Sequence, residues 1–331
     1  MRIAVLMGGD SPEREVSLAS GRAVAGALRE RGHEVEEIDL ARVADVIGLD
    51  ALRRVDVVFP TLHGGQGEDG HLQALLDVLD IPYALSGPRA SAIAMDKAIT
   101  KQVMRAAGIP TPDWLQVTWD RSAARPGALA AGDAAAEADT GGLTVDTVFR
   151  RAAAEIGFPL VVKLNGAGSS VGVEIVDRPD QFTAALERVL AAPCRSCINL
   201  LIEKFIPGRE LTATILMGRR LPLLEIRPRE GFYDYRNKYT AGASEYLVPA
   251  PVHSPVYEQI CADALRVYEL LGCRGVARVD FRLDGDTYKC LEINTIPGMT
   301  ATSLVPKAAA AVGIGFGDLL EDICRAALDP D

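Results

Sequence analysis

Residues 1–32 read MRIAVLMGGDSPEREVSLASGRAVAGALRERG, in which a short apolar run and a glycine pair precede a longer amphipathic run. Ile3–Met7 has the pattern of a buried strand, and the glycine pair predicts a turn. Ser11 and Pro12 are typical of a helix start, because serine caps the first turn and proline fits the first helical position. Apolar side chains then recur at helical spacing until Gly32. The stretch therefore predicts a strand that leads directly into a helix.

The same alternation continues along the first hundred residues. Three more strands are predicted at 33–40, 55–60 and 81–86, and a helix at about 70–80. Strands that alternate with helices indicate the α/β class, with a doubly wound parallel sheet. Ligands bind such sheets beyond the carboxyl ends of the strands. The loops 8–13 and 62–70 (LHGGQGEDG) follow predicted strands in this way and are candidate binding loops.

The composition narrows the classes of partner and compartment. A length of 331 residues suffices for two or three domains. The formal net charge of −10 argues against nucleic acids and anionic membranes as partners. The N-terminus lacks the long apolar segment of a signal peptide or membrane span, so we expect a cytoplasmic location. Cys194 and Cys197 are the only close cysteine pair, which favours reduced cysteines over a zinc or redox site.

A second region of different character follows. Residues 120–145 are rich in alanine, glycine and aspartate, which predicts a surface insertion without an assigned function. After it, a small α+β unit is predicted from helices at about 145–157 and 179–191 and strands at 159–164, 171–176 and 199–204. This unit surrounds the loop KLNGAGSSVG at 163–172. Its lysine precedes the glycines, and its glycine spacing is one residue off the dinucleotide pattern, so neither common nucleotide fingerprint is present.

The segments GVARVDFRL (275–283) and YKCLEINT (288–295) predict a hairpin that carries carboxylates. Charged and apolar residues alternate in both. With a loop of odd length, Arg278 would face Glu292 directly and Asp280 would lie one diagonal away. A two-residue loop would put these residues on opposite faces. We predict the odd length, with a loop of three residues, Asp-Gly-Asp.

In that register Asp280, Glu292 and Asn294 would converge near Arg278. Two carboxylates and an amide present only oxygen atoms, which suits Mg²⁺. A solvated hairpin face is the alternative. The continuation NTIPGMTATSLVP (294–306) favours the metal site, because a glycine- and hydroxyl-bearing loop follows the ligands where a substrate would lie.

Eight stretches, all in one order, give the chain a resemblance to the D-alanine–D-alanine ligases of the ATP-grasp superfamily. They are GGDSPEREVSL (8–18), LHGGQGEDG (62–70), MDK (95–97), GSSVG (168–172), EKFIPGREL (203–211), FYDYRNKY (232–239), RVDF (278–281) and LEINTIPGMTATSLVP (291–306). The resemblance implies an N-terminal Rossmann-like domain at 1–97 and two ATP-grasp α+β subdomains. The central subdomain would span 98–208 and carry the insertion, and the C-terminal one would span 209–331 and hold the metal and substrate site.

The resemblance also implies an activity, that of an ADP-forming carbon–nitrogen ligase that joins two D-alanines for peptidoglycan and cell-wall synthesis. ATP, held between the central and C-terminal subdomains, would phosphorylate the carboxylate of the first D-alanine. The amine of the second would then attack the acyl phosphate. The implied cofactors are ATP and two Mg²⁺ ions, for which Mn²⁺ could substitute, and the implied assembly is a homodimer. A related ligase that uses D-serine or D-lactate as the second substrate is the alternative.

The resemblance assigns roles around the nucleotide. Lys97, Lys163 and Lys238 are implied for the phosphates. Glu203, Lys204, Phe205 and Ile206 are implied for the adenine, and Glu210 for the ribose. The implied metal ligands are Asp280, Glu292 and Asn294. Arg278 and the main-chain N–H of Gly298 would stabilise negative charge in both transition states. Solvated surface side chains are the alternative for the lysines and glutamates, and a plain ion pair with Glu292 is the alternative for Arg278.

Roles around the amino acids are implied in the same way. Glu13 would bind the ammonium of the first D-alanine, although the helix dipole also explains a glutamate at that position. His63 could polarise the acyl group, and Ser303 with the backbone of Leu304 would bind the carboxylate of the second D-alanine. A metal site built from His63, Glu68, Asp69 and His71 is disfavoured, because the spacing suits no simple chelate.

Tyr239 bears on the choice of the second substrate. In the family, a tyrosine here, linked through Ser169 to Glu13, marks ligases that use an amino acid instead of a hydroxy acid. The segment 232–245 would be a lid that closes over ATP, with Lys238 reaching the γ-phosphate, and closure would keep water from the acyl phosphate.

Three positions depart from the family pattern, which has a proline, an acidic residue and a small hydroxyl residue where this chain has Leu164, Ala167 and Ile296. None of the three removes a catalytic group. A nucleotide-binding oxidoreductase is excluded, since MGGDSPER (7–14) lacks the dinucleotide glycines after the first strand. A non-catalytic ATP-binding protein is the remaining rival class, and unchanged ATP turnover after Glu292→Gln would favour it.

Overall fold

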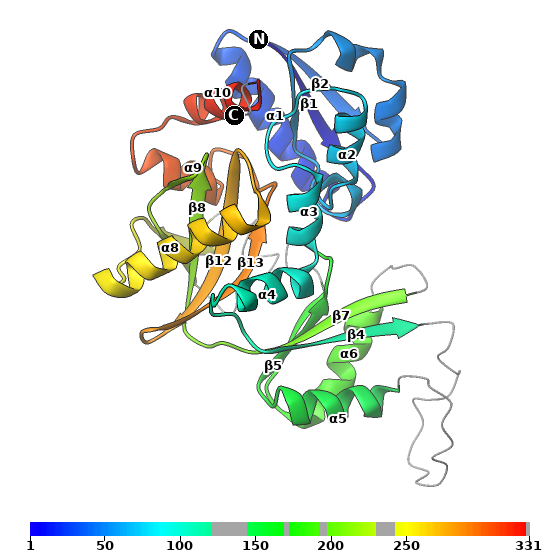
Figure 1. The fold of residues 1–331 in the computed structure, drawn as a ribbon, viewed down its shortest axis with the longest axis vertical. Helices are drawn as coiled ribbons and strands as arrows, with labels where there is room; N and C mark the ends of the chain where they lie inside the picture. The colour runs from blue at the N-terminus through cyan, green and yellow to red at the C-terminus, as the bar shows by residue number, and fades with distance from the viewer. Residues whose placement is uncertain (121–143, 169–171, 192–196, 230–241, 329–331) are drawn as a thin grey trace. The chain divides into compact units, whose positions relative to one another are not determined.

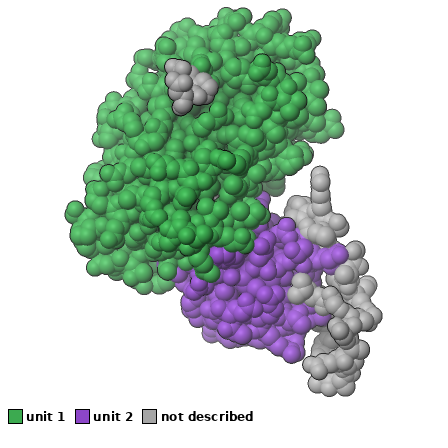
Figure 2. Space-filling model, in the orientation of Figure 1, with its two compact units in different colours: residues 1–111, 207–331 green, residues 112–206 purple. Residues whose placement is uncertain are grey.

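The computed structural model describes residues 1–120, 144–168, 172–191, 197–229 and 242–328. The chain forms two compact units (Figure 2), of which the first combines 1–111 with 207–331 and the second comprises 112–206. The first and third of the domains expected from the sequence thus both fall in the first unit. Among the described helices, none combines the length and the apolar character required to cross a membrane.

The N-terminal part of the first unit is a parallel sheet with helices around it (Figure 1). Its strands are β1 (Arg2–Gly8), β2 (Glu34–Leu40) and β3 (Val57–Pro60), in the order β2-β1-β3. The helix α1 (Arg14–Glu30) connects β1 to β2, as the opening residues predict. The remaining helices are η1 (Val43–Gly48), η2 (Asp50–Arg54), η3 (Gly65–Gly67), α2 (His71–Val78), α3 (Pro88–Met95) and α4 (Lys97–Ala106). The predicted α/β class is confirmed.

The prediction of a strand at 81–86 was wrong in extent, because the pairing there is much shorter than predicted. Only a single parallel bridge forms, between Val58 and Tyr83. Pro82 accepts the Val58 N–H through its carbonyl at 2.8 Å but has no N–H of its own to donate. Leu85 has a φ of 74°, which is outside the extended region and ends the run.

The C-terminal part of the first unit is an antiparallel sheet with a helix on one face. The strands are β8 (Arg209–Leu216), β9 (Arg219–Arg220), β10 (Leu224–Pro228), β11 (Ser244–Leu247), β12 (Val276–Asp284) and β13 (Thr287–Asn294). They run in the order β11-β10-β8-β12-β13, with β9 paired to β8. The inward side chains of β8, β12 and β13 form one apolar core with α3, α4 and α8 (Ser254–Leu271). The charged alternate positions of β8 and β12 are therefore left on the opposite face.

The hairpin of β12 and β13 corrects the loop prediction. Asp284 pairs with Thr287, so the turn contains two residues, Gly285 and Asp286, and not three. Gly285 has a φ of 57°, the left-handed conformation that tight hairpin turns require. A two-residue turn alone would send the charged positions of β12 and β13 to opposite faces.

A β-bulge restores the shared face. Phe281 pairs with Cys290, whereas the adjacent Asp280 pairs with Glu292, so Leu291 is an extra residue on β13. One extra residue reverses the alternation beyond it. The result is that Asp280 faces Glu292, and Arg278 faces Asn294, in contrast to the predicted Arg278–Glu292 pairing.

The N-terminal and C-terminal parts of the first unit share a second apolar core. It combines side chains of β1, β3 and α1 with Ile296, Met299, the helix α9 (Leu304–Ala310) and the helix α10 (Phe316–Leu328). This core fixes the loop that follows β13 against β1, β3 and α1. It also explains the apolar residue at position 296, since Ile296 packs inside it.

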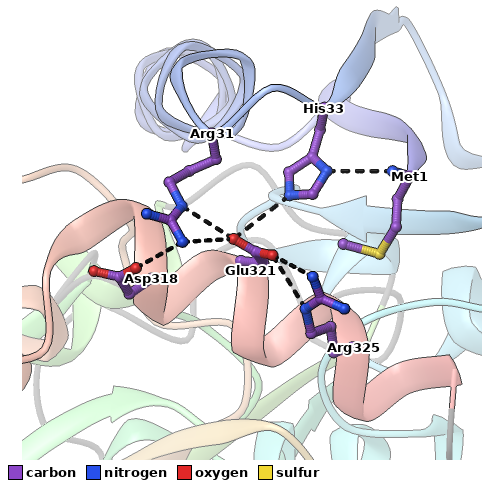
Figure 3. Close-up of polar contacts among 6 residues, drawn as sticks. All are labelled: Met1, Arg31, His33, Asp318, Glu321 and Arg325. Atoms are coloured by element: carbon purple, nitrogen blue, oxygen red, sulfur yellow. Dashed lines mark hydrogen bonds and ion pairs between the residues drawn. The ribbon is translucent and has the colours of Figure 1, made fainter.

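Ion pairs at the surface fasten α10 beside α1 (Figure 3). Glu321 of α10 accepts a hydrogen bond from Arg31 Nε at 3.0 Å and is also paired with Arg325. His33 lies 3.7 Å from the same carboxylate. Hydrogen bonds from Arg325 and Arg31 lower the pKa of Glu321 to about 2. The carboxylate therefore stays charged across the neutral range and holds α10 to the residue that ends α1.

The second unit is a four-stranded antiparallel sheet in the order β4-β7-β5-β6. Its elements are β4 (Trp114–Asp120), α5 (Val145–Glu155), β5 (Leu160–Leu164), β6 (Val173–Val176), η4 (Pro179–Gln181), α6 (Phe182–Leu190) and β7 (Cys197–Lys204). Phe149, Phe158 and Phe182 cluster with ring centroids 5.6 to 6.5 Å apart and join the helices to the sheet. Apart from β4, these elements were predicted from the sequence. Most of the predicted insertion lies outside the described residues.

Candidate active site

Arg278 and Asp280 form the centre of the charged face of the hairpin. Arg278 donates from Nε to Asp280 Oδ1 and from Nη2 to Oδ2, each at 2.9 Å. Thr212 on β8 donates its hydroxyl to Oδ1 at 2.7 Å. The neighbouring strands position these groups, because β8 places Thr212 directly opposite Asp280. This charge-assisted fork fixes both side chains.

Glu292 and Asn294 complete the set of oxygen donors. Glu292 lies 3.4 Å from the ammonium of Lys97, the first residue of α4. The side-chain oxygen of Asn294 accepts the N–H of Ile296 at 3.0 Å. With Asp280 opposite Glu292, two carboxylates and one amide share a face, and all their donor atoms are oxygen. The described residues hold no group of three or more His, Cys, Asp or Glu side chains that could bind a metal.

Arg282 and Glu210 extend the charged face along β12 and β8. Arg282 donates to Glu210 at 3.3 Å and to the carbonyl of Gly208 at 2.8 Å. Burial lowers the pKa of Arg282, while the charge of Glu210 opposes that change. Glu210, expected at the ribose, is therefore held in place by an arginine that the sequence reasoning did not assign.

The second unit holds Lys163 and the segment 203–206, which were also expected at the nucleotide. Lys163 on β5 lies 2.5 Å from Glu203 on β7, and both side chains are buried. Lys204 donates its ammonium to the carbonyl of Phe158 at 3.0 Å. The N–H of Phe205 donates to the carbonyl of Pro159 at 3.2 Å, and Ile206 is the last residue of this unit.

The loop after β1 brings Glu13 to the buried loop that follows β3. Ser11 donates its hydroxyl to the carbonyl of His63 at 2.5 Å and accepts the N–H of Glu13 at 3.1 Å. Gly64 has a φ of 68°, and a Cβ there would lie 2.5 Å from a carboxylate oxygen of Glu13. Only glycine fits this approach. Glu13 and the loop at His63 therefore belong to one polar region of the first unit, and the charge of Arg278 acts on His63 there.

Glu68 and His63 have displaced pKa values in this region. Burial, together with the charge of Glu13, raises the pKa of Glu68 to about 7, and the carboxyl accepts the N–H of Gly64 at 2.9 Å. Burial, together with the charge of Arg278, lowers the pKa of His63 to about 4. At neutral pH the histidine is therefore neutral, and the glutamate retains a proton more readily than an exposed carboxylate does. Sequence reasoning weighed Glu68 only as a metal ligand and missed its place beside Glu13.

Asp69 and His71 lie apart from this buried pair. His71 Nδ1 is 2.7 Å from Asp69 Oδ1, and the histidine side chain is exposed. Among the described residues, the side chains of His63, Glu68, Asp69 and His71 do not form a group that could hold a metal ion.

The loop after β13 carries the remaining expected residues. Ser303 precedes α9, its hydroxyl lies 2.8 Å from that of Thr300, and it accepts the Thr300 N–H at 3.1 Å. Leu304 begins α9 and packs on β10. A Cβ on Gly298 would lie 3.4 Å from the Ser303 hydroxyl, so Gly298 and Ser303 are neighbours. Ser169, Lys238 and Tyr239 lie outside the described residues.

The structure also reveals Ser20, which no motif indicated. Its hydroxyl lies 3.3 Å from His63 Nε2 and accepts the N–H of Met299 at 3.4 Å. The only signal in the sequence is a serine on the apolar face of a predicted helix. Small polar residues are common there, so the signal is weak.

Comparison with known proteins points to one family. Residues 44–86 match the family model for the D-ala D-ala ligase N-terminus, and residues 103–325 match the one for the D-ala D-ala ligase C-terminus. The D-alanine–D-alanine ligase of Desulforudis audaxviator is 46% identical over 98% of both chains, and that of Moorella thermoacetica is 43% identical over 100% of both. The crystal structure of the D-alanine–D-alanine ligase from Bacillus anthracis complexed with ATP is 33% identical, with a TM-score of 0.80, and covers 100% of this chain and 98% of that one. The chain belongs to the D-alanine–D-alanine ligase family.

Proposed function

We propose that the charged face of the β12–β13 hairpin binds the magnesium and phosphate groups of ATP in the ligation of two D-alanines, the reaction of this family. One carboxylate oxygen of the first D-alanine takes the γ-phosphoryl group, and ADP leaves. The amine of the second D-alanine then attacks the acyl carbon, and inorganic phosphate leaves. The products are D-alanyl-D-alanine, ADP and phosphate, which identifies the protein as a carbon–nitrogen ligase of peptidoglycan precursor synthesis.

One observation carries this proposal. The bulge at Leu291 puts Asp280, Glu292 and Asn294 on one face, where the two-residue turn alone would separate them. Bulges that re-aim side chains are typical of functional sites. Bound Mg²⁺, or Mn²⁺ in its place, would neutralise the β- and γ-phosphates at these oxygen donors.

Other side chains of the first unit fit the remaining charges. Arg278 lies on the same face as the oxygen donors and would stabilise the charge that develops on the transferred phosphoryl and acyl groups. The Gly298 N–H would assist at the acyl oxygen. Glu13 would bind the ammonium of the first D-alanine, and Ser303 with the N–H of Leu304 would bind the carboxylate of the second.

The remaining nucleotide contacts are proposed in both units. Lys97 and Lys163 would bind the α- and β-phosphates, the segment 203–206 would bind adenine, and Glu210 would bind the ribose. For Lys238, Ser169 and Tyr239 the proposal rests on the sequence, and neutral Tyr239 supports an amino acid as the second substrate. We also propose a homodimer that works in the cytoplasm, as expected of this family.

A coupled assay with identification of the product tests this function. ADP formation should depend on D-alanine alone and on Mg²⁺ or Mn²⁺, and mass spectrometry should detect D-alanyl-D-alanine. D-serine or D-lactate, added with limiting D-alanine, should compete poorly for the second position. An absence of ADP with D-alanine alone would contradict the proposal, and efficient D-lactate incorporation would favour the depsipeptide alternative.

A pair of hairpin variants tests the site. Glu292→Gln should lower kcat by about a thousandfold, because it removes a charged ligand of the metal. Asp286→Asn is the matched control, since Asp286 is an exposed carboxylate in the turn of the same hairpin, 2.8 Å from His253. Equal activity of the two variants would disprove the metal assignment.

A further inference from the structure

Ser20 joins three segments of the first unit at a buried point. It lies on α1 and is 1% exposed. Its hydroxyl is 3.3 Å from Nε2 of His63, in the loop after β3. The same hydroxyl accepts the N–H of Met299, in the loop after β13, at 3.4 Å. A buried hydroxyl with two such neighbours has hydrogen-bond partners within the protein.

His63 reaches the same loop through its ring. The imidazole lies near the main chain of Ile296, and this backbone favours the protonated ring, so it presents a carbonyl to the ring. Ile296 in turn donates its N–H to the side chain of Asn294 at 3.0 Å. The segment 296–299 is thus held at its last residue by Ser20, and its first residue lies near the His63 ring. Gly298 lies between these two residues.

We propose that Ser20 and His63 are positioning residues that hold the segment 296–299, and with it the N–H of Gly298, in the geometry that acyl transfer requires. The inference rests on the proposed function, which places the Gly298 N–H at the acyl oxygen. A misplacement of that donor by about 1 Å is enough to slow a reaction strongly. The proposal gives His63 a role behind the loop instead of contact with the acyl group.

The donors and acceptors of this cluster match when the histidine is neutral. A neutral imidazole carries one N–H, which would face the Ile296 carbonyl, and one lone pair, which would accept the hydroxyl proton of Ser20 at Nε2. The Ser20 oxygen then accepts from Met299. A second proton on the ring would point a donor at the Ser20 hydroxyl and reverse this bond. Burial and the charge of Arg278, which hold the pKa of His63 at about 4, keep the ring in the required form.

A serine pair on α1 provides the kinetic test. Ser20→Ala should lower kcat between about tenfold and a hundredfold while the KM for ATP stays unchanged, because only the acyl-oxygen donor shifts. Ser17→Ala is the matched control, since Ser17 is also buried on α1 and accepts one main-chain N–H, that of Gly8, at 2.9 Å. It should keep the wild-type kcat. Equal kcat values for the two variants would overturn the proposal.

The histidine ring offers a readout that a loss of packing alone would not move. The chain has four histidines, so imidazole nitrogen resonances in ¹⁵N-labelled protein are few enough to assign by variants. In the wild type, His63 should be neutral at pH 6, with its proton on Nδ1 and Nε2 as the acceptor. Ser20→Ala should shift the Nε2 resonance toward that of a weaker acceptor. A proton on Nε2 in the wild type would contradict the proposed hydrogen bond from the Ser20 hydroxyl to Nε2.

A double variant separates a shared role from two independent ones. If both residues act through the segment 296–299, Ser20→Ala combined with His63→Gln should lose no more kcat than the more impaired single variant. Multiplied losses would refute a common role. The wild-type assay keeps the two claims distinct: without D-alanine-dependent ADP formation the proposed function fails, whereas wild-type turnover with an unimpaired Ser20→Ala variant removes only this inference.

Discussion

Each unit contains a lysine–glutamate pair, and the two pairs differ in burial. In the second unit, Lys163 lies 2.5 Å from Glu203, with 9% and 5% of their side chains exposed. In the first unit, Lys97 lies 3.4 Å from Glu292, with 9% and 32% exposed. The charges are the same, and both lysines are proposed to bind phosphates. The difference is that Glu292 has access to solvent and Glu203 does not.

This difference separates a pair that supports the fold from one that can change partners. A buried carboxylate that loses its lysine keeps its charge without water to replace the cation. A carboxylate that reaches solvent is rehydrated at little cost. We therefore expect the Lys163 pair to stabilise the second unit and the Lys97 pair to serve mainly the ligand. Four variants test this contrast, and the expected change in the free energy of unfolding decreases from the first, Lys163→Met, to the last, Lys97→Met.

Lys163→Met should have the largest effect. It leaves Glu203 buried without its lysine, which should lower the free energy of unfolding by about 3–5 kcal/mol. Denaturant unfolding followed by far-UV circular dichroism measures this change. ATP binding should be lost as well, as isothermal titration calorimetry would show.

A second substitution separates the two effects of Lys163→Met. Lys163→Met with Glu203→Leu replaces the pair by apolar side chains of similar size, which should restore most of the stability. ATP binding should remain absent in this double variant. If the single variant is as stable as the wild type, the buried pair does not support the second unit, and the contrast with Lys97 is lost.

Glu68→Gln sharpens the comparison through pH. Glu68 is also buried, and it accepts the Gly64 N–H. It lies near the like charge of Glu13, whereas Glu203 lies beside a lysine. Its pKa rises from 4.5 to about 7 in the folded protein. The folded state therefore binds the proton more tightly, and the stabilisation is complete below pH 4.5 and is lost as the pH rises through 7.

The expected shift for Glu68→Gln is on the order of 3 kcal/mol between pH 4.5 and pH 8, in favour of the variant at the higher pH. Glutamine keeps an oxygen that accepts the Gly64 N–H, so packing and hydrogen bonding are matched. Urea unfolding at the two pH values measures the difference. A variant whose stability relative to wild type is the same at both would show that Glu68 titrates normally.

The sequence predicted the periodic elements well and the hairpin geometry incompletely. Alternation and helical spacing located β1, α1 and the elements of the second unit other than β4, because local pattern determines which face of an element is buried. The bulge at Leu291 was not predictable, since a strand with an extra residue has no distinct composition. The sequence analysis placed Asp280 and Glu292 on one face by assuming a three-residue loop. In the structure the bulge places them there instead.

The residues that sequence reasoning missed act through tertiary contacts. Ser20, Glu68 and Arg282 gain their roles from partners far away in the chain, on other elements. A serine in a helix, an acidic loop residue and an arginine on a strand are each common in solvent-exposed positions. Only the fold shows that they are buried beside groups proposed to bind substrate.

Arg282→Met should have an intermediate effect. Arg282 pairs with Glu210 at 3.3 Å in a position that is mostly shielded from solvent. Loss of the arginine should cost about 2 kcal/mol of unfolding free energy, between the values for exposed and buried pairs. The KM for ATP should rise because Glu210 loses its support. Arg220→Met is the control, since its pair with Glu258 is exposed and should contribute less than about 1 kcal/mol.

Lys97→Met should have the smallest effect on stability and so provides the strictest test of the comparison. Glu292 becomes hydrated when the lysine is removed, so the free energy of unfolding should fall by less than about 1 kcal/mol. The KM for ATP should nevertheless rise by at least about tenfold, because the proposed phosphate contact of Lys97 would be lost. Lys97→Arg keeps the charge and should retain more of the ATP affinity. If Lys97→Met instead destabilises the protein as much as Lys163→Met, solvent access to the carboxylate is not what distinguishes the two pairs.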